Sequence, residues 1–221
     1  MDNEILNNKK LATHVNFTRM DPEARKALLV KATLACLKKH GFQGLSVRKI
    51  CTQAGVSLGL ISHYYSGKDA LVAEAYQTIT DEVMTQLTVA MAENAEQGVR
   101  QQLSAFFQAS FSKQLLNTFL LEAWLAFWGA VRTSDSIRQA HDRSYTSYRS
   151  ILEQALKQLS TEQGWDNFNY ELAAISLTAV IDGLWLEHGL DPNIFTPDEG
   201  IKICEAWVDG LIAGGYKRLC K

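Results

Sequence analysis

The stretch LSVRKICTQAGVSLGLISHYYSGKDAL, residues 45–71, has the spacing of two short helices joined by a tight turn. Ser46 is suited to cap a first helix whose inner side would carry Val47, Ile50, Cys51 and Ala54. Gly55 would end this helix, and Ser57 would cap a second one with Leu60 and Ile61 inside. Two short helices joined by a Gly-containing turn predict a helix-turn-helix.

The second helix of such a motif enters the major groove of DNA, and its early residues meet base edges. Here that helix would run from Ser57 to Tyr64, with four residues facing outward: Leu58, Gly59, Ser62 and His63. Arg48 on the preceding helix is long enough to reach a guanine or a phosphate, while Tyr64 and Lys68 suit phosphate oxygens. Capped short helices also occur in proteins that bind no DNA, and His63 would then be an ordinary surface histidine.

The charge of the chain is divided unevenly along its length. The net charge of the 221 residues is −2, but residues 1–68 hold 11 Lys or Arg against 4 Asp or Glu, a net +7. Residues 69–221 hold 11 basic and 20 acidic side chains, a net −9. A basic first third favours a nucleic-acid partner for that part of the chain.

Helical signals continue along the chain on both sides of this stretch. Asp21-Pro22-Glu23 predicts a helix start, and Gly41 would end that helix. Residues 1–20 lack apolar periodicity and are expected to form a flexible basic arm with Lys9, Lys10 and Arg19. A long helix is predicted over 69–92, followed by helices near 98–114, 118–131, 135–159, 167–189 and 197–213. No alternating strand pattern is evident, so the fold class is predicted to be all-α.

Composition narrows the class of protein. No segment supplies the roughly 18 uninterrupted apolar residues of a membrane span, and the first residues lack a secretion-signal pattern. We therefore expect a cytoplasmic protein with no membrane partner. The four cysteines form no Cys-x-x-Cys pair, so we expect no metal site and no cofactor.

Two apolar blocks, residues 122–128 and 179–187, are rich in tryptophan. On helices, Trp124 and Trp128 would share a face, as would Asp182 and Trp185. Aromatic walls beside an acid suit a quaternary ammonium ion through cation–π attraction and charge pairing. Aromatic residues at helical spacing are also ordinary core, so both interpretations stay open. The candidate ligand-binding residues are Glu122, Trp124, Phe127, Trp128, Asp182 and Trp185.

Other functions have less support. The pairs Glu187-His188 and His141-Asp142 belong to no recognisable catalytic motif, so we predict no catalytic residue and no enzyme. A module that has lost DNA binding would not need Arg48 or His63. The last two predicted helices carry more apolar residues than one buried face needs, which indicates burial on both sides or a partner helix.

The stretch 45–71, with a match that extends back to about Arg25, resembles the signature of the TetR family of repressors. The family usually has an aromatic residue where this chain has Ser62. Ile61-Ser62-His63-Tyr64 is similar instead to a narrower group, the choline-responsive repressors of betaine biosynthesis, and the two tryptophan blocks resemble the same group. By position, the resemblance assigns DNA contacts to Ser46, Arg48, Ser57, Gly59, Ser62, His63, Tyr64 and Lys68.

The resemblance implies a nine-helix fold with a DNA-binding domain at 21–68 and a ligand-binding and dimerisation domain at 69–221. It implies a homodimer, formed through the last helix pairs, on a palindromic double-stranded DNA operator. It further implies repression of genes for glycine betaine synthesis and choline uptake, with release by a small cation such as choline. The alternative is a repressor of efflux or catabolic genes that senses another small molecule.

Overall fold

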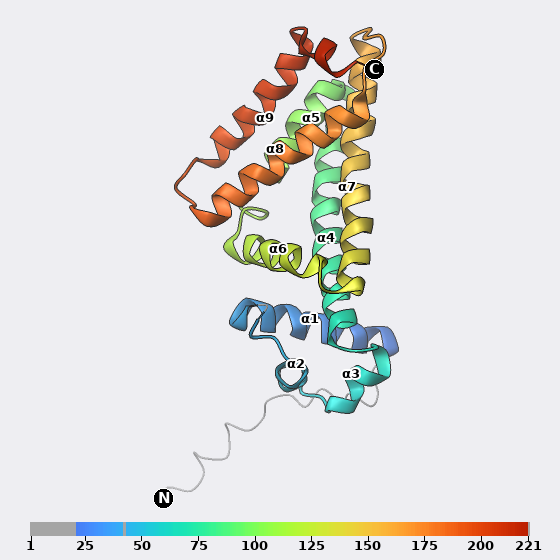
Figure 1. Ribbon diagram of the computed structural model, residues 1–221, viewed down its shortest axis with the longest axis vertical. Coiled ribbons are helices and arrows are strands. Elements are labelled where there is room, and N and C mark those ends of the chain that lie inside the picture. The colour runs from blue at the N-terminus through green and yellow to red at the C-terminus, as the bar shows by residue number, and fades with distance from the viewer. Residues whose placement is uncertain (1–20, 42, 221) are drawn as a thin grey trace, which may run out of the picture. The chain divides into compact units, whose positions relative to one another are not determined.

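The computed structural model describes residues 21–41 and 43–220, which form nine α-helices and no β-strand (Figure 1). The all-α, nine-helix prediction is therefore confirmed. The predicted arm at 1–20, with Lys9, Lys10 and Arg19, lies outside the described residues. No helix in the described ranges combines the length and apolar character needed to span a membrane.

The chain divides into two compact units between Ala75 and Tyr76, which is inside helix α4 (Lys68–Ala92). The sequence predicted the end of the DNA-binding domain earlier, at Lys68. The first two turns of α4 bury Leu71, Val72 and Ala75 completely, and this apolar start of the helix belongs to the first unit.

The first unit contains α1 (Pro22–His40), α2 (Val47–Ala54) and α3 (Leu58–Tyr64). The Asp21 carboxylate accepts a hydrogen bond from the Glu23 amide, and Pro22 occupies the first helical position, as the sequence predicts. The apolar side chains that the three helices turn inward form a small core of Leu29, Val30, Cys36, Leu37, Ile50, Cys51 and Ile61.

The second unit contains α5 (Val99–Ser110), α6 (Thr118–Val131), α7 (Asp135–Glu162), α8 (Tyr170–Leu190) and α9 (Pro197–Ile212). Side-chain caps start several of these helices: Asn117 for α6, Asn169 for α8, and a capping box of Thr196 and Glu199 for α9. Short 3-10 turns lie at Ala95–Gln97 and Gly215–Leu219.

Helix bounds agree with the predicted ranges to within a few residues, and two differences have local causes. The predicted helix at 98–114 ends at Ser110, because the apolar residues beyond it, Phe111 and Leu115, are buried in a turn instead. Helix α8 starts at Tyr170 and not at 167, because Asn167 has a φ of 57°, which a right-handed helix cannot contain.

Specific polar contacts hold the helices of the second unit together. The hydroxyls of Thr80 on α4 and Ser144 on α7 are buried and lie 2.8 Å apart. Arg100 on α5 forms ion pairs with Glu205 and Asp209 on α9. Figure 1 shows α4 and α7 running side by side as the two longest helices, with α8 crossing them. Residues of α4, α6, α7 and α8 line the candidate ligand site described below.

Candidate functional site

The turn between α2 and α3 has the geometry that a helix-turn-helix needs. The Ser46 hydroxyl accepts a hydrogen bond from the Lys49 amide and caps α2. Gly55 is left-handed (φ 68°), and the amides of Gly55 and Val56 donate to the carbonyls of Thr52 and Cys51. These bonds satisfy the free carbonyls at the end of α2 and reverse the chain sharply.

Helix α3 turns one side to the core and the other to solvent. Ile61 is 1% exposed, whereas Leu58 is 53% exposed. The other exposed residues of this region are Ser57, Gly59, Ser62 and His63, as the sequence predicted for an outward face. Ser57 occupies the predicted capping position, but its side chain accepts no capping hydrogen bond, so that part of the prediction is wrong. The Cys51 thiol on α2 donates a hydrogen bond to the Ser57 carbonyl at the start of α3.

The remaining DNA-contact candidates lie around α3. Arg48 on α2 is exposed, and Lys68 is half-buried at the start of α4. Tyr64 is half-buried, and its hydroxyl accepts a hydrogen bond from Arg25 Nη1 at 3.2 Å. This bond joins the first helix to the end of the third. The structure thus brings an exposed face and several cationic groups into one unit, while their contacts with DNA stay predictions.

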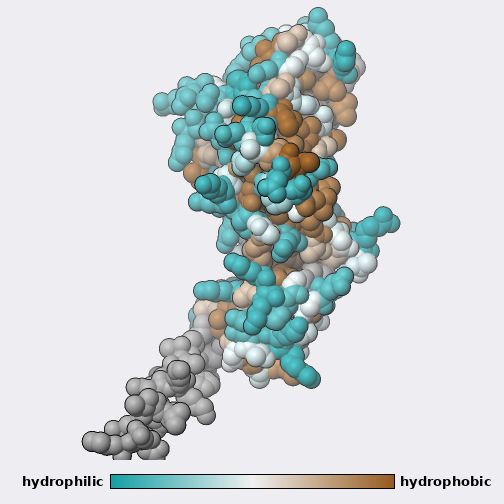
Figure 2. Space-filling view, turned by 90° about the vertical axis from the view of Figure 1, so that its left-hand side faces the viewer, coloured by the Kyte–Doolittle hydropathy of each residue, from teal (hydrophilic) through white to brown (hydrophobic). Residues whose placement is uncertain are grey.

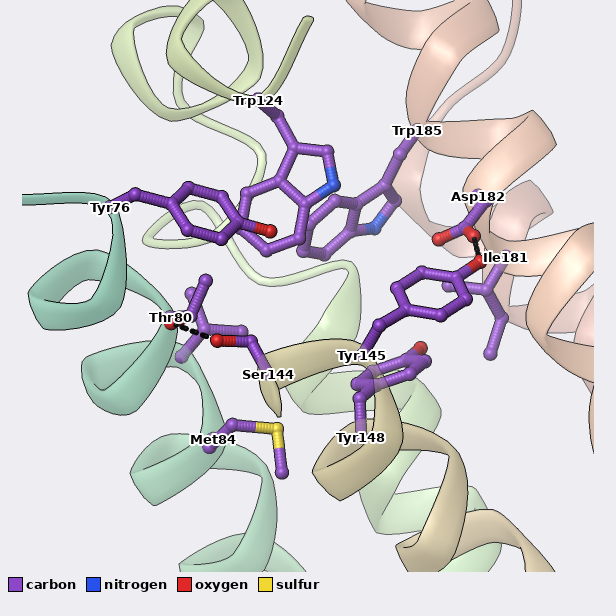
Figure 3. A pocket seen from close by; sticks show the side chains of 11 residues that line it. Tyr76, Thr80, Met84, Trp124, Ser144, Tyr145, Tyr148, Ile181, Asp182 and Trp185 are labelled. Carbon is purple, nitrogen blue, oxygen red and sulfur yellow. Dashed lines mark hydrogen bonds between the residues drawn. The ribbon is translucent and has the colours of Figure 1, made fainter. Parts of the chain in front are cut away.

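A separate cavity lies in the second unit between α4, α6, α7 and α8 (Figure 3). Its free volume is about 20 Å³, which is room for about one water molecule. The wall is mostly aromatic and aliphatic, with one acid: Tyr76, Thr80, Val83, Met84, Trp124, Ser144, Tyr145, Tyr148, Ile181, Asp182 and Trp185.

The structure brings three of the six predicted ligand residues to this cavity, namely Trp124, Asp182 and Trp185. Glu122 is exposed to solvent and Phe127 is buried against Tyr76, with ring centroids 4.6 Å apart, so neither lines the cavity. Trp128 lies one turn further along α6. It borders an open hollow next to the cavity, which also includes Arg132, His141, Tyr145 and Asp182.

Sequence reasoning missed the contributions of α4 and α7. Tyr76, Thr80 and Met84 are spaced four residues apart on α4, and Tyr145 and Tyr148 are three apart on α7. Helical spacing of polar and aromatic residues was therefore a usable signal. This spacing is hard to recognise in α7, because that helix is mostly polar. In α4 it is hard to recognise because a stronger apolar stripe runs beside it.

The aromatic rings of the cavity are in mutual contact. The Tyr76 and Trp124 ring centroids are 5.8 Å apart, and those of Trp124 and Trp185 are 5.7 Å apart with planes at 72°. Tyr145 and Tyr148 have centroids 6.5 Å apart. Such a wall presents negative ring faces and apolar surface to whatever enters, which favours a cation or an apolar group.

Asp182 is the acid of this cavity, and its environment is mixed. Burial raises the pKa of its carboxyl above the usual range, while a hydrogen bond from Tyr145 and the nearby His141 and Arg149 hold the pKa down. The Arg149 guanidinium lies over the Tyr145 ring, 5.1 Å from its centroid. The carboxylate therefore has hydrogen-bonded support without a direct ion pair in the described residues.

The described residues contain no cluster of three or more His, Cys, Asp or Glu side chains placed to hold a metal. The arrangement has two functional parts: an exposed helix-turn-helix face in the first unit, and an aromatic cavity with one acid in the second. Such a combination suits a protein that reads DNA and senses a small molecule.

Comparisons with known proteins agree with this arrangement. Residues 29–75 match the bacterial regulatory proteins of the TetR family, and residues 99–213 match the C-terminal domain of BetI-type transcriptional repressors. The HTH-type transcriptional regulator BetI of Vibrio parahaemolyticus is 29% identical over 189 residues, which is 85% of this chain and 92% of that protein. The BetI 1 regulator of Chromohalobacter salexigens is 29% identical over 196 residues, covering 86% and 91% of the two chains.

Solved structures that resemble this chain are also transcriptional regulators. A crystal structure of a proposed transcriptional regulator from Pseudomonas aeruginosa PAO1 is 61% identical, with a TM-score of 0.86, and covers 93% of this chain and 98% of its own. A regulator from Rhodococcus sp. Rha1 is 24% identical and has a TM-score of 0.71, with 86% and 96% coverage. The chain therefore belongs to the TetR family and is a DNA-binding transcriptional repressor of the BetI type, not an enzyme.

Proposed function

We propose that this repressor controls genes for glycine betaine synthesis from choline and for choline uptake. Its cavity binds choline or another small quaternary ammonium ion, and binding releases the operator. A repressor of chromosomal genes works where the DNA is, so this role implies a cytoplasmic protein.

The observation that carries the proposal is the combination of rings and charge around the cavity. Tyr76, Trp124, Tyr145 and Trp185 supply aromatic surface, and Asp182 supplies the negative charge. A trimethylammonium group is large, weakly hydrated and unable to donate strong hydrogen bonds. Ring faces and one carboxylate stabilise such an ion by cation–π attraction and charge pairing.

Relatives support this choice of ligand. The curated relatives above carry the BetI name. A regulator from Saccharomonospora viridis that shares the fold, at 17% identity and a TM-score of 0.70, was crystallised in complex with choline. A Bacillus subtilis regulator of the same fold was crystallised with stearoyl-CoA, so the fold itself admits other ligands. The residues of the cavity, and not the fold, therefore carry the argument for a cation.

The narrowness of the cavity suggests how binding is signalled. A free volume of about 20 Å³ is too small for a trimethylammonium group, so a ligand must move part of the wall. Helix α4 supplies Tyr76, Thr80 and Met84 to that wall and continues without a break to Lys68, next to α3. A ligand that binds only the opened cavity shifts the population toward the conformation in which α4 has moved.

The DNA side of the proposal uses the exposed face of α3. Ser57, Leu58, Gly59, Ser62 and His63 would meet bases and sugars, while Arg48, Tyr64 and Lys68 would position the backbone. The homodimer would place two such faces on a palindromic operator.

The proposed dimer interface lies on α8 and α9. Both helices are apolar on two sides, because Leu177, Ile181, Val208 and Leu211 are buried inside the unit while other large apolar residues remain exposed. Figure 2 shows hydrophobic surface on the side of the molecule where α9 lies. The exposed residues are Leu172, Ile175, Leu186, Leu190, Ile194 and Ile203.

Two measurements on the full chain test the proposal. Calorimetry with choline and a panel of quaternary amines should detect binding that is lost in Trp185→Ala and kept in Trp165→Phe, a tryptophan outside the cavity that stacks on Tyr216. A mobility shift on DNA that flanks the gene should show specific binding, weakened by the same ligand.

The results can contradict the proposal in two ways. Absence of specific DNA binding at low and moderate salt would remove the operator part. Specific DNA binding with no response to any quaternary amine would favour a repressor of efflux or catabolic genes with another effector.

A further inference from the structure

Each of the two tryptophans in the cavity carries a polar atom that has no partner. The indole Nε1 atoms of Trp124 and Trp185 are buried, and neither has a hydrogen-bond acceptor. In Figure 3 the ring nitrogen of Trp185 lies on the side toward Tyr145, and that of Trp124 lies on the side toward Trp185. Buried donors normally have partners, because a buried donor without one loses its hydrogen bonds to water and gains no other hydrogen bond.

Contact between the two rings accounts for one of these donors at most. Trp124 and Trp185 meet edge to face, with planes at 72°. In this arrangement the edge of one ring points at the face of the other, so only one N–H can point at its neighbour. An N–H bond to a ring face is also weaker than one to oxygen. At least one indole N–H thus remains available to a group inside the cavity.

Several polar groups of the cavity wall are engaged in hydrogen bonds. The Asp182 carboxylate accepts from Tyr145, and the hydroxyls of Thr80 and Ser144 share a hydrogen bond. Thr80 also donates to the carbonyl of Gln77. The wall therefore offers indole donors that its own acceptors do not satisfy.

We propose that the effector carries an oxygen acceptor, a hydroxyl or a carboxylate, a few bonds from its cationic nitrogen, and that Trp124 or Trp185 donates to this oxygen. The inference rests on the proposed function, because the cation brings the ligand to the aromatic wall. Cation–π attraction and Asp182 hold the ammonium end, but neither satisfies an N–H donor. An oxygen does so, and a methyl group at the same place would leave the donor without a partner.

The free space in the cavity strengthens this requirement. It has room for about one water molecule, which could accept from an indole in the ligand-free protein. A ligand that displaces such a water with an oxygen keeps the hydrogen bond, whereas one that displaces it with a methyl group loses the bond.

The test compares ligands that differ only in the oxygen. Choline and propyltrimethylammonium have nearly the same size and charge, but only choline has a hydroxyl; glycine betaine replaces the hydroxyl end with a carboxylate. In calorimetry on the full chain, we expect choline or glycine betaine to bind about 10- to 100-fold more tightly than propyltrimethylammonium. The better of the two shows which oxygen group the site takes.

Variants then locate the donor. Trp124→Phe and Trp185→Phe keep an aromatic ring but lose the N–H, so in at least one of them the preference for the oxygen-bearing ligand should fall to about twofold or less. Because the ratio compares two cations in one variant, a general loss of cation–π attraction cancels. Trp165→Phe is the matched control, since it makes the same substitution at a tryptophan outside the cavity and leaves both cavity indoles. Thermal unfolding and operator binding check that each variant is folded.

Each outcome has one meaning. Equal binding of propyltrimethylammonium and the oxygen-bearing cations overturns the inference and leaves the cation site intact. A preference that is kept in both Trp124→Phe and Trp185→Phe also overturns it, because the donor is then another group. Failure of all three ligands to bind the parent protein overturns both the proposed function and the inference.

Discussion

The hydroxyl of Tyr145 donates a hydrogen bond to Oδ2 of Asp182, across the space between α7 and α8. These two residues line both the narrow cavity and the open hollow beside it, so their bond lies on the boundary between the two. The charge of Asp182 and this bond are therefore the features of the cavity most open to direct measurement.

Binding of a cation should depend on pH through Asp182. Its pKa is raised by burial, so the carboxylate is lost earlier than usual as the pH falls, and affinity for the cation should fall with it. Tyr145→Phe removes a donor that stabilises the carboxylate, so this loss should begin at a higher pH. Calorimetry with choline over a pH series measures the shift.

Two controls isolate Asp182 in that series. Tyr148→Phe removes a hydroxyl that lines the same cavity. The pH midpoint of choline binding in this variant should be closer to that of the parent protein than the midpoint in Tyr145→Phe. His141 also faces Asp182, so His141→Gln separates its effect on the Asp182 carboxyl. A midpoint that stays fixed in Tyr145→Phe would show that the hydrogen bond does not control the charge.

Removal of the charge of Asp182 should stabilise the ligand-free protein. The folded-state pKa of Asp182 lies above the unfolded-state pKa, so ionisation of its carboxyl destabilises the folded protein. The free energy of unfolding therefore falls as the pH rises from the unfolded-state pKa through the raised folded-state pKa. Asp182→Asn keeps an acceptor for Tyr145 and removes the charge. Its melting temperature at neutral pH should exceed that of the parent protein, while added choline should no longer raise it. A lower melting temperature without ligand would contradict this view.

The buried hydrogen bond between Thr80 and Ser144 should contribute measurably to stability. Because the Thr80 proton is directed to the Gln77 carbonyl, Ser144 is the donor in the 2.8 Å contact. Ser144→Ala should lower the free energy of unfolding by about 1 kcal/mol. Ser147→Ala, on the exposed side of the same helix, is the matched control and should change it by less than about 0.5 kcal/mol. Urea titrations compare the two variants.

Two glycines of the helix-turn-helix separate folding from DNA reading. Gly55 has a φ of 68°, so Gly55→Ala should cost about 1–2 kcal/mol of stability. Gly59 is exposed in α3, and an added Cβ there meets nothing within 4 Å, so Gly59→Ala should keep or increase stability. If the exposed face of α3 enters the major groove, Gly59→Ala should nevertheless weaken specific binding in a mobility shift. Unchanged operator affinity would place the reading face elsewhere.

An acidic residue on the exposed face of α8 or α9 should dissociate the proposed dimer. Ile175→Glu and Ile203→Glu each place a charge where a partner helix would pack, and sedimentation should show monomers at concentrations where the parent protein is dimeric. Val89→Glu on α4 has a similarly exposed starting side chain and should leave the dimer intact. Equal effects of all three variants would argue against an interface at α8 and α9.

Sequence reasoning predicted the helix-turn-helix closely because its signals are local. Asp21, Ser46 and Gly55 act on groups within a few residues, so their effect can be inferred without the tertiary structure. The Ser57 side chain was the exception, since it occupies the capping position without accepting a capping hydrogen bond.

The cavity was predicted only in part because its members come from four helices. Helix α6 is apolar on nearly every side, so spacing alone could not tell Trp124, at the cavity, from Phe127, in the core. Trp128 shares a face with Trp124, but it borders the open hollow and not the cavity. Tyr145 was missed because it faces Asp182 across 37 residues of chain, a relationship that no local pattern contains.

The small free volume of the cavity has a consequence for the dose at which an inducer acts. If the site must widen before it admits a ligand, the apparent dissociation constant rises in inverse proportion to the fraction of molecules in the widened state. The proposed sensor therefore does not respond to low concentrations of a compound that the cell always contains, and it responds only to high concentrations. Substitutions that loosen the packing of Met84 or Ile181 would lower this threshold without touching the ligand's charge or its oxygen.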